Sequence, residues 1–141
     1  MQSVVAMKRW DKDEFQNLFE WQMVENMSRL LTQTCEEMRL GSDQEWILEV
    51  IRESADNLPE SIIEGQESDY LAEYILGLSA ARNALVVASY CFRFLKGQKL
   101  IEPDKADYVD GRLEELEEVL AQVTETLRAS LSSGQGQFSN N

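Results

Sequence analysis

The chain has 141 residues, of which 43% are apolar, and it carries a formal net charge of −13. This length and composition predict one domain with a core of its own. The negative charge argues against simple nucleic-acid binding. The absence of histidine and of a paired CxxC motif argues against the usual zinc and haem sites and against histidine-based catalysis.

The composition also favours a helical, cytoplasmic protein. Glycine and proline number only 7 and 2, while leucine and glutamate are plentiful. No uninterrupted apolar run reaches the roughly 20 residues of a membrane span, and the N-terminus lacks the apolar core of a secretory signal. The two cysteines, Cys35 and Cys91, occupy apolar helical positions, so we expect buried free thiols.

A first helix is predicted after an N-terminal extension of residues 1–10. Asp11 or Asp13 can cap it, and it should end near Leu40 and Gly41. Its apolar residues recur at steps of three and four, which is typical of an amphipathic helix. They are Phe15, Leu18, Phe19, Val24, Met27, Leu30, Leu31, Cys35 and Met38.

A second helix is predicted from a capping box at Ser42 and Glu45 to a stop at Gly65, where positive φ would be tolerated. Pro59 lies inside this helix. It cannot donate to the carbonyl four residues earlier, so we expect a bend there. The apolar stripe consists of Trp46, Ile47, Val50, Ile51, Leu58 and Ile62, with Ala55 marking a close neighbour.

The third predicted helix is the most apolar and therefore should be central. Ser68 or Asp69 can cap it, and Gly97 closes it. Ala80, Ala81 and Ala84 leave a flat strip for close helix packing. Its broad stripe comprises Tyr70, Leu71, Tyr74, Ile75, Leu78, Leu85, Ala88, Cys91, Phe92 and Leu95.

The fourth predicted helix begins at Pro103, where a missing N–H costs no hydrogen bond. Its apolar residues follow a heptad-like spacing, and residues 132–141 after it have the composition of a disordered tail. Residues 11–131 should thus form one all-α, antiparallel up-down-up-down four-helix bundle. The predicted seam of the last helix is Val109, Leu113, Leu116, Leu120, Val123 and Leu127.

Two segments resemble the four-helix-bundle proteins encoded by intervening sequences of 23S ribosomal RNA. The first helix carries Phe15, Leu18, Trp21 and Gln22 at the spacing of that family. The second helix resembles the family's run of arginine, small residues, Ser-Ile-Pro and Asn-Ile-Ala-Glu-Gly. The matching residues, which we treat as a structural signature, are Arg52, Ala55, Pro59, Ile62, Glu64 and Gly65.

The segment Phe92–Gly97 followed by Pro103 is also similar to a related branch, the accessory variability proteins of diversity-generating retroelements. The resemblance covers roughly residues 13–131. It implies a four-helix subunit that forms a ring-like homopentamer, and for the retroelement branch an association with reverse transcriptase and RNA. For the intervening-sequence members it implies no established enzymatic activity.

Charge is distributed in bands along the chain. Residues 36–73 hold twelve acidic residues against two bases, whereas residues 74–101 hold no acidic residue and four bases. Arg82 and Arg93 are three helical turns apart and share a face, with Lys96 one turn further and Lys99 beyond the helix end. These bases could form a stripe for phosphates, or they could pair with acidic residues on the second and fourth helices.

Other candidates have two interpretations as well. Trp10, Trp21 and Trp46 could serve an interface or pack in the core. Glu64 could be a functional acid, or it could pair with Arg52 or accept turn N–H groups. The acidic side of the last helix could bind a basic partner or a cation, or could simply be solvated.

We therefore expect a non-enzymatic, self-associating scaffold or adaptor, with a pentamer favoured, that presents acidic surfaces to a protein partner and has no cofactor. The alternative is a retroelement accessory protein that binds reverse transcriptase and RNA through the third-helix bases. A remote alternative is a carboxylate-based metalloenzyme, although the Glu-x-x-His motifs of dinuclear bundle sites require histidine.

Overall fold

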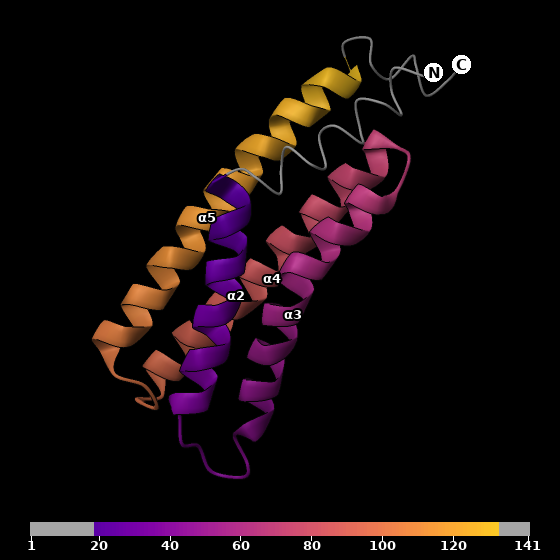
Figure 1. Cartoon of the computed structure of the whole chain (residues 1–141). Helices are drawn as coiled ribbons and strands as arrows, with labels where there is room; N and C mark the ends of the chain where they lie inside the picture. Colours follow the sequence, from indigo (N-terminus) through magenta and orange to yellow (C-terminus); the bar gives the residue numbers. More distant parts are fainter. Residues whose placement is uncertain (1–18, 133–141) are drawn as a thin grey trace.

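The computed structural model describes residues 19–132 and confirms the all-α four-helix bundle. The helices are α2 (Phe19–Glu37), α3 (Glu45–Glu67), α4 (Leu71–Gly97) and α5 (Pro103–Ser130). Successive helices run antiparallel, and no strand lies within the described residues (Figure 1). The start of the first helix, Trp10, the extension of residues 1–10 and most of the predicted tail lie outside the described range.

Each helix packs against two neighbours, so α2 contacts α3 and α5, and α4 contacts α3 and α5. The closest packing joins α3 to α4. Large side chains from all four helices are fully buried between them, because each helix turns its apolar stripe inward. Among them are Leu31, Ile51, Leu58, Ile62, Leu78, Leu85, Phe92, Leu95, Leu113, Leu116 and Leu120.

Pro59 lies inside α3, which continues through it as one helix. In an α-helix the carbonyl of Ala55 would accept the N–H of residue 59, but proline has none. The hydroxyl of Ser28 on α2 donates to this carbonyl instead, at 2.8 Å. The proline therefore frees a backbone acceptor for a hydrogen bond between two helices.

This arrangement predicts that Ser28 and Pro59 are energetically coupled. Ser28→Ala should lower the free energy of unfolding by about 1 kcal/mol, because it leaves the Ala55 carbonyl without its partner. In a Pro59→Ala background the new N–H can take that carbonyl, so the same change should cost almost nothing. Chemical denaturation of the four proteins measures the coupling, and an equal cost in both backgrounds would contradict it.

Gly65 does not end α3, contrary to the sequence prediction. It is buried within the helix, does not have positive φ, and is followed by two more helical residues. Its role is a close approach: a Cβ at Gly65 would lie 3.1 Å from the backbone oxygen of Glu73, and one at Gly77 would lie 2.5 Å from the backbone oxygen of Ser61. The backbones of α3 and α4 therefore meet at Gly65 and Gly77.

The close contact of α3 and α4 predicts that the stability of the protein depends strongly on side-chain size at Gly77. Gly77→Ala should lower the free energy of unfolding by about 2 kcal/mol or more, because the methyl group meets backbone that cannot rotate away. Gly97→Ala is the matched control, since nothing lies within 4 Å of its Cβ position, and it should be neutral or slightly stabilising. A Gly77→Ala protein as stable as the wild type in thermal and denaturant unfolding would refute the crossing.

Helix ends differ from the predictions in their local chemistry. The capping box is absent: α3 begins at Glu45 with Gln44 as its N-cap, and no side chain bonds there. Tyr70 precedes α4 as its N-cap, and its N–H donates to the Ser68 hydroxyl within the turn. At the other end of α4, Gly97 is the last helical residue as predicted. The chain reverses at Lys99, whose φ is 61°, and the Leu100 N–H returns to the Leu95 carbonyl.

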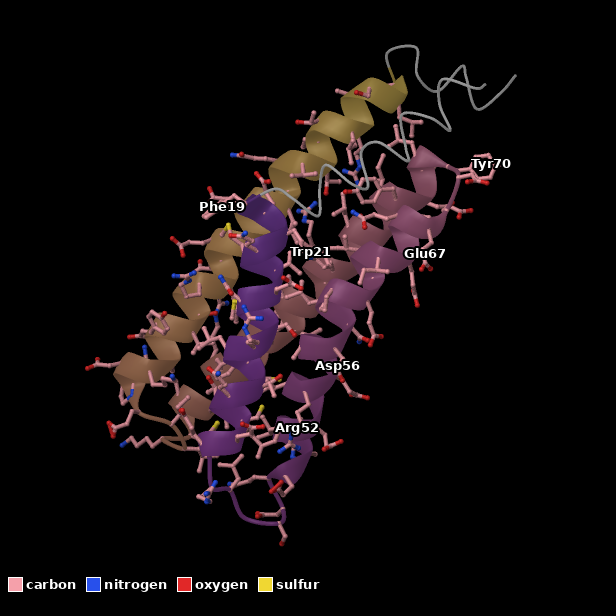
Figure 2. All side chains as sticks on the ribbon, viewed as in Figure 1. Phe19, Trp21, Arg52, Asp56, Glu67 and Tyr70 are labelled. Carbon is pink, nitrogen blue, oxygen red and sulfur yellow. The ribbon has the colours of Figure 1, made fainter. Side chains whose placement is uncertain are left out.

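Phe19, Trp46 and Tyr70 are wrong as predicted core positions, and the end of the predicted α5 seam is only half-buried. Phe19 and Tyr70 were assigned to apolar stripes, but both are exposed and project away from the bundle (Figure 2). Along α5 the seam is buried from Val109 to Leu120, but the next buried position is Thr124. The Thr124 hydroxyl donates a hydrogen bond to the Leu120 carbonyl at 2.7 Å, so a polar residue is tolerated there. Val123 and Leu127 are only half-buried.

α4 is long and apolar enough, by length and composition, to cross a membrane. Its most apolar 18-residue window has a mean hydropathy of 1.4, although Arg82 interrupts the apolar run. The buried core helix of a bundle has the same properties. A cytoplasmic location stays a prediction.

Candidate functional site

The third-helix bases pair with acidic residues of α5. Arg82 Nε lies 2.7 Å from a Glu117 carboxylate oxygen, Arg93 Nε lies 3.2 Å from Asp110, and Lys96 Nζ lies 2.6 Å from Asp107. Asp110 also accepts a hydrogen bond from the Ser89 hydroxyl at 2.5 Å. The basic band and the acidic band of the sequence therefore pair with each other between α4 and α5.

These pairs weigh against the phosphate interpretation, because each guanidinium or ammonium already has a carboxylate beside it. Of the two alternatives left open by the sequence, pairing within the subunit is what the structure shows, and the acids come from α5 alone. Lys99 lies apart, in the exposed turn after α4. It belongs to no ion pair among residues 19–132.

The tryptophans divide between the two interpretations. Trp21 is half-buried and packs against the core. Trp46, in the first turn of α3, is 57% exposed, and its ring centroid lies 6.3 Å from that of Phe94 on α4. An exposed pair of large aromatic rings is a typical feature of a protein interface.

Trp46 and Phe94 belong to a larger surface, which we call the α3–α4 apolar face. Leu76, Ala80, Val87 and Phe94 follow one line along α4 at steps of four and seven residues. Leu76 is 66% exposed and Phe94 is 44% exposed. Val50 and Val87 line a groove of about 260 Å³ between the two helices. The face thus consists of Trp46, Val50, Leu76, Ala80, Val87 and Phe94.

The apolar composition of α4 is the feature of the sequence that indicates this face. α4 has apolar residues on more than one side, so its apolar stripe is too broad for the neighbours available in one bundle. Between Glu73 and Arg93 the only charged residue of α4 is Arg82, which turns toward Glu117 on α5. The remaining side of α4 is therefore both apolar and uncovered.

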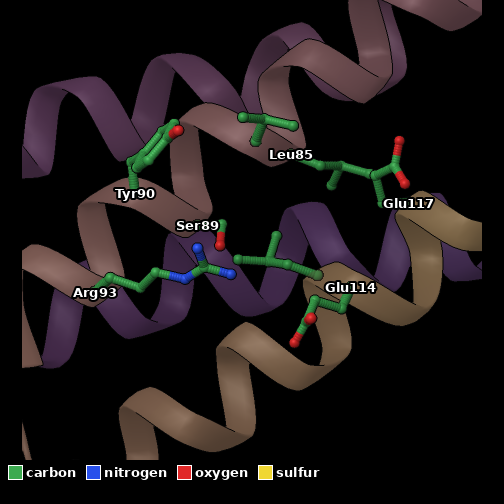
Figure 3. Close-up of a pocket in the computed structure, with 8 residues that line it drawn as sticks. Leu85, Ser89, Tyr90, Arg93, Glu114 and Glu117 are labelled. Carbon is green, nitrogen blue, oxygen red and sulfur yellow. The ribbon is translucent and has the colours of Figure 1, made fainter.

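A second groove lies on the other side of α4, where it packs beside α5. This α4–α5 groove has a volume of about 230 Å³. Figure 3 shows Ser89, Tyr90 and Arg93 on α4 facing a wall of α5 that carries Glu114 and Glu117. Its apolar lining is Leu85, Val86 and Leu113.

The residues of the structural signature differ in their burial and in their partners. Ile62 is fully buried, and Pro59 and Gly65 act on helix packing as described above. Arg52 pairs with Glu49 one turn away at 2.9 Å, not with Glu64, so that expected pair is wrong. Glu64 is exposed on the outside of α3 and forms no ion pair among the described residues.

Both cysteines are buried free thiols, as predicted. Burial raises the pKa of Cys35 from 9.0 to about 11, and it raises the pKa of Cys91 as well. Thiols held in the protonated form are poor nucleophiles. No group of three or more acidic or cysteine residues within 19–132 is arranged to hold a metal ion.

The raised pKa of Cys35 predicts a loss of stability in alkali. The unfolded thiol ionises near pH 9 and the folded thiol near pH 11, so the stabilisation present below pH 9 disappears between these values. Two pKa units correspond to roughly 2–3 kcal/mol. In denaturant unfolding from pH 8 to 11, the stability advantage of the wild type over Cys35→Ala should shrink. An advantage that stays constant would show that Cys35 does not titrate this way.

Neither the known protein-family models nor the curated protein sequences give a match to this chain. The resemblance to intervening-sequence and retroelement accessory proteins therefore stays a prediction based on the motifs quoted above.

Proposed function

We propose that this protein is a non-enzymatic, self-associating scaffold or adaptor that binds a protein partner, and that a second copy of the chain covers its α3–α4 apolar face. The observation that carries the proposal is the exposure of three large apolar side chains, Trp46, Leu76 and Phe94, on the side of the bundle formed by α3 and α4. Large apolar side chains exposed together in this way are typical of interaction sites in soluble proteins.

The size of the face supports a second copy as its occupant. It extends along α4 from Leu76 to Phe94, about 27 Å at 1.5 Å per residue. Two helices side by side make it about 20 Å wide, which gives a flat area on the order of 500 Å². Protruding side chains add to this area. A stable interface needs about 800 Å² from each partner, so this face supplies the apolar centre of one.

The charges around the face differ in their pairing. Arg93, at its edge, is paired with Asp110 on the far side, whereas Glu53, which lines the groove with Val50 and Val87, forms no ion pair among residues 19–132. A ring-like pentamer is the assembly that the family resemblance favours. A contact between different surfaces of neighbouring copies closes into a ring when the rotation allows it.

The remaining surface is suited to a basic protein partner. Outside the core, α5 exposes a row of carboxylates that gives this side of the bundle negative charge. The row comprises Asp104, Asp107, Glu114, Glu115, Glu118 and Glu125. The alternative role beside reverse transcriptase and RNA has the motif resemblance as its support. The carboxylate metalloenzyme has none in the geometry of the described residues.

Self-association predicts a specific response to charge. Phe94→Glu should weaken self-association at least about 30-fold, because it places a carboxylate within the apolar contact, beside Trp46. Mass photometry and sedimentation at micromolar concentration measure the change. Tyr108→Glu is the matched control, since Tyr108 is 53% exposed on α5, away from the face, and this variant should assemble like the wild type.

Circular dichroism of both variants establishes that the bundle is folded. A wild-type chain that is monomeric at micromolar concentration refutes the self-association. A Phe94→Glu protein with the oligomeric state of the wild type refutes the assignment of the α3–α4 apolar face to it.

A further inference from the structure

The α4–α5 groove has an apolar base and charged walls. Leu85 and Leu113 are buried core residues that close its base, and Val86 lines its side. Tyr90 is 67% exposed beside it. The volume of about 230 Å³ is smaller than the roughly 300 Å³ at which sites for small organic ligands begin. The groove is therefore suited to one long side chain of a partner.

Most charges around the groove are compensated. Glu117 is paired with Arg82, and Arg93 is paired with Asp110. Glu114, on the α5 wall, forms no ion pair or hydrogen bond among residues 19–132. The groove thus has one uncompensated negative charge, and the cation that lines it is already neutralised.

An aromatic ring and a free carboxylate stand on opposite walls. Tyr90 comes from α4 and Glu114 from α5 (Figure 3). An arginine side chain meets both with complementary chemistry, because its planar guanidinium stacks on aromatic rings and bonds carboxylates in bidentate fashion. Its aliphatic stem can cover the apolar base of the groove.

We infer that the α4–α5 groove binds an arginine side chain from a basic, amphipathic helical segment of a partner protein. The arginine stem lies on Leu85, Val86 and Leu113, and its guanidinium bonds Glu114 at the α5 wall, beside Tyr90 and the paired Arg93. This inference rests on the proposed function, because it names the chemistry of the partner that the scaffold binds. The groove borders the α3–α4 apolar face, because Tyr90 lies one helical turn from both Val87 and Phe94, whereas Glu114 lies on α5.

An anionic ligand is the opposite reading of the same groove, since Arg93 lines it. The carboxylates disfavour that ligand: Glu114 and Glu117 stand on one wall, and Asp110 already bonds Arg93 and Ser89. A phosphate would displace an existing ion pair and approach an unpaired carboxylate. A cation neutralises that carboxylate without breaking either pair.

The test uses a fluorescein-labelled, 16-residue helical peptide with leucines along one side and arginines on its flanks. Its matched control has glutamine in place of every arginine. Fluorescence anisotropy with the full-length chain at low salt should show binding of the arginine peptide and at least about tenfold weaker binding of the glutamine peptide. Glu114→Gln and Tyr90→Ala should each weaken binding of the arginine peptide about tenfold.

Glu115→Gln is the control for general charge. It removes the same charge from the next residue of α5, but Glu115 pairs with Arg112 and does not line the groove. This variant should bind the arginine peptide like the wild type. Equal weakening by Glu114→Gln and Glu115→Gln would overturn the inference, as would equal binding of the two peptides or no binding at low salt.

The outcome is separable from that of the self-association proposal. Glu114→Gln should keep the oligomeric state of the wild type, because Glu114 lies on α5 and outside the α3–α4 apolar face. A monomeric protein that binds the arginine peptide through Glu114 upholds the groove and refutes self-association. An oligomer without that binding does the reverse.

Discussion

The close contact of α3 and α4 at Gly65 and Gly77 determines how the rest of the bundle is arranged. A helix as apolar as α4 would otherwise need neighbours on every side. Because the two backbones touch, α4 lies deep against α3 and buries its small residues, such as Ala81 and Ala88, at that contact. The side of α4 that faces neither α3 nor α5 is left apolar and exposed. The exposed apolar side chains of α4 are thus a consequence of the helix packing.

Ion pairs connect α4 to α5 along the other side of α4. Arg82, Arg93 and Lys96 project toward α5 and meet Glu117, Asp110 and Asp107. Partly exposed ion pairs of this kind add little to stability individually. Their larger effect is on the net field, because they cancel a basic segment of a strongly acidic chain. What remains outside the seam is negative charge, with Glu114 unpaired at the groove.

The order of the helices and most of the core could be predicted from the sequence, because a period of three to four residues reports which side of a helix is buried. The roles of single residues could not. Gly65 looked like a helix stop because glycine often is one, but only the partner helix shows that its missing side chain is needed for contact. Trp46 was named as an interface candidate, whereas Phe94 and Leu76 became candidates only when the neighbours of α4 were known. Glu114 differs from the other glutamates of α5 in that it lines the α4–α5 groove without an ion pair, and the sequence alone does not reveal this.

The hydrogen bond from Ser28 to the Ala55 carbonyl also sets the axial register of α2 on α3. Apolar stripes alone tolerate slippage, because sliding one helix past another by a turn of 5.4 Å replaces one set of aliphatic contacts with a similar one. Sliding α2 by one turn would break the hydrogen bond between Ser28 and the Ala55 carbonyl, and another donor, such as the Thr32 hydroxyl one turn further along α2, would have to replace it. The proline at position 59 therefore contributes specificity, because it frees a backbone acceptor that favours the observed alignment of α2 on α3.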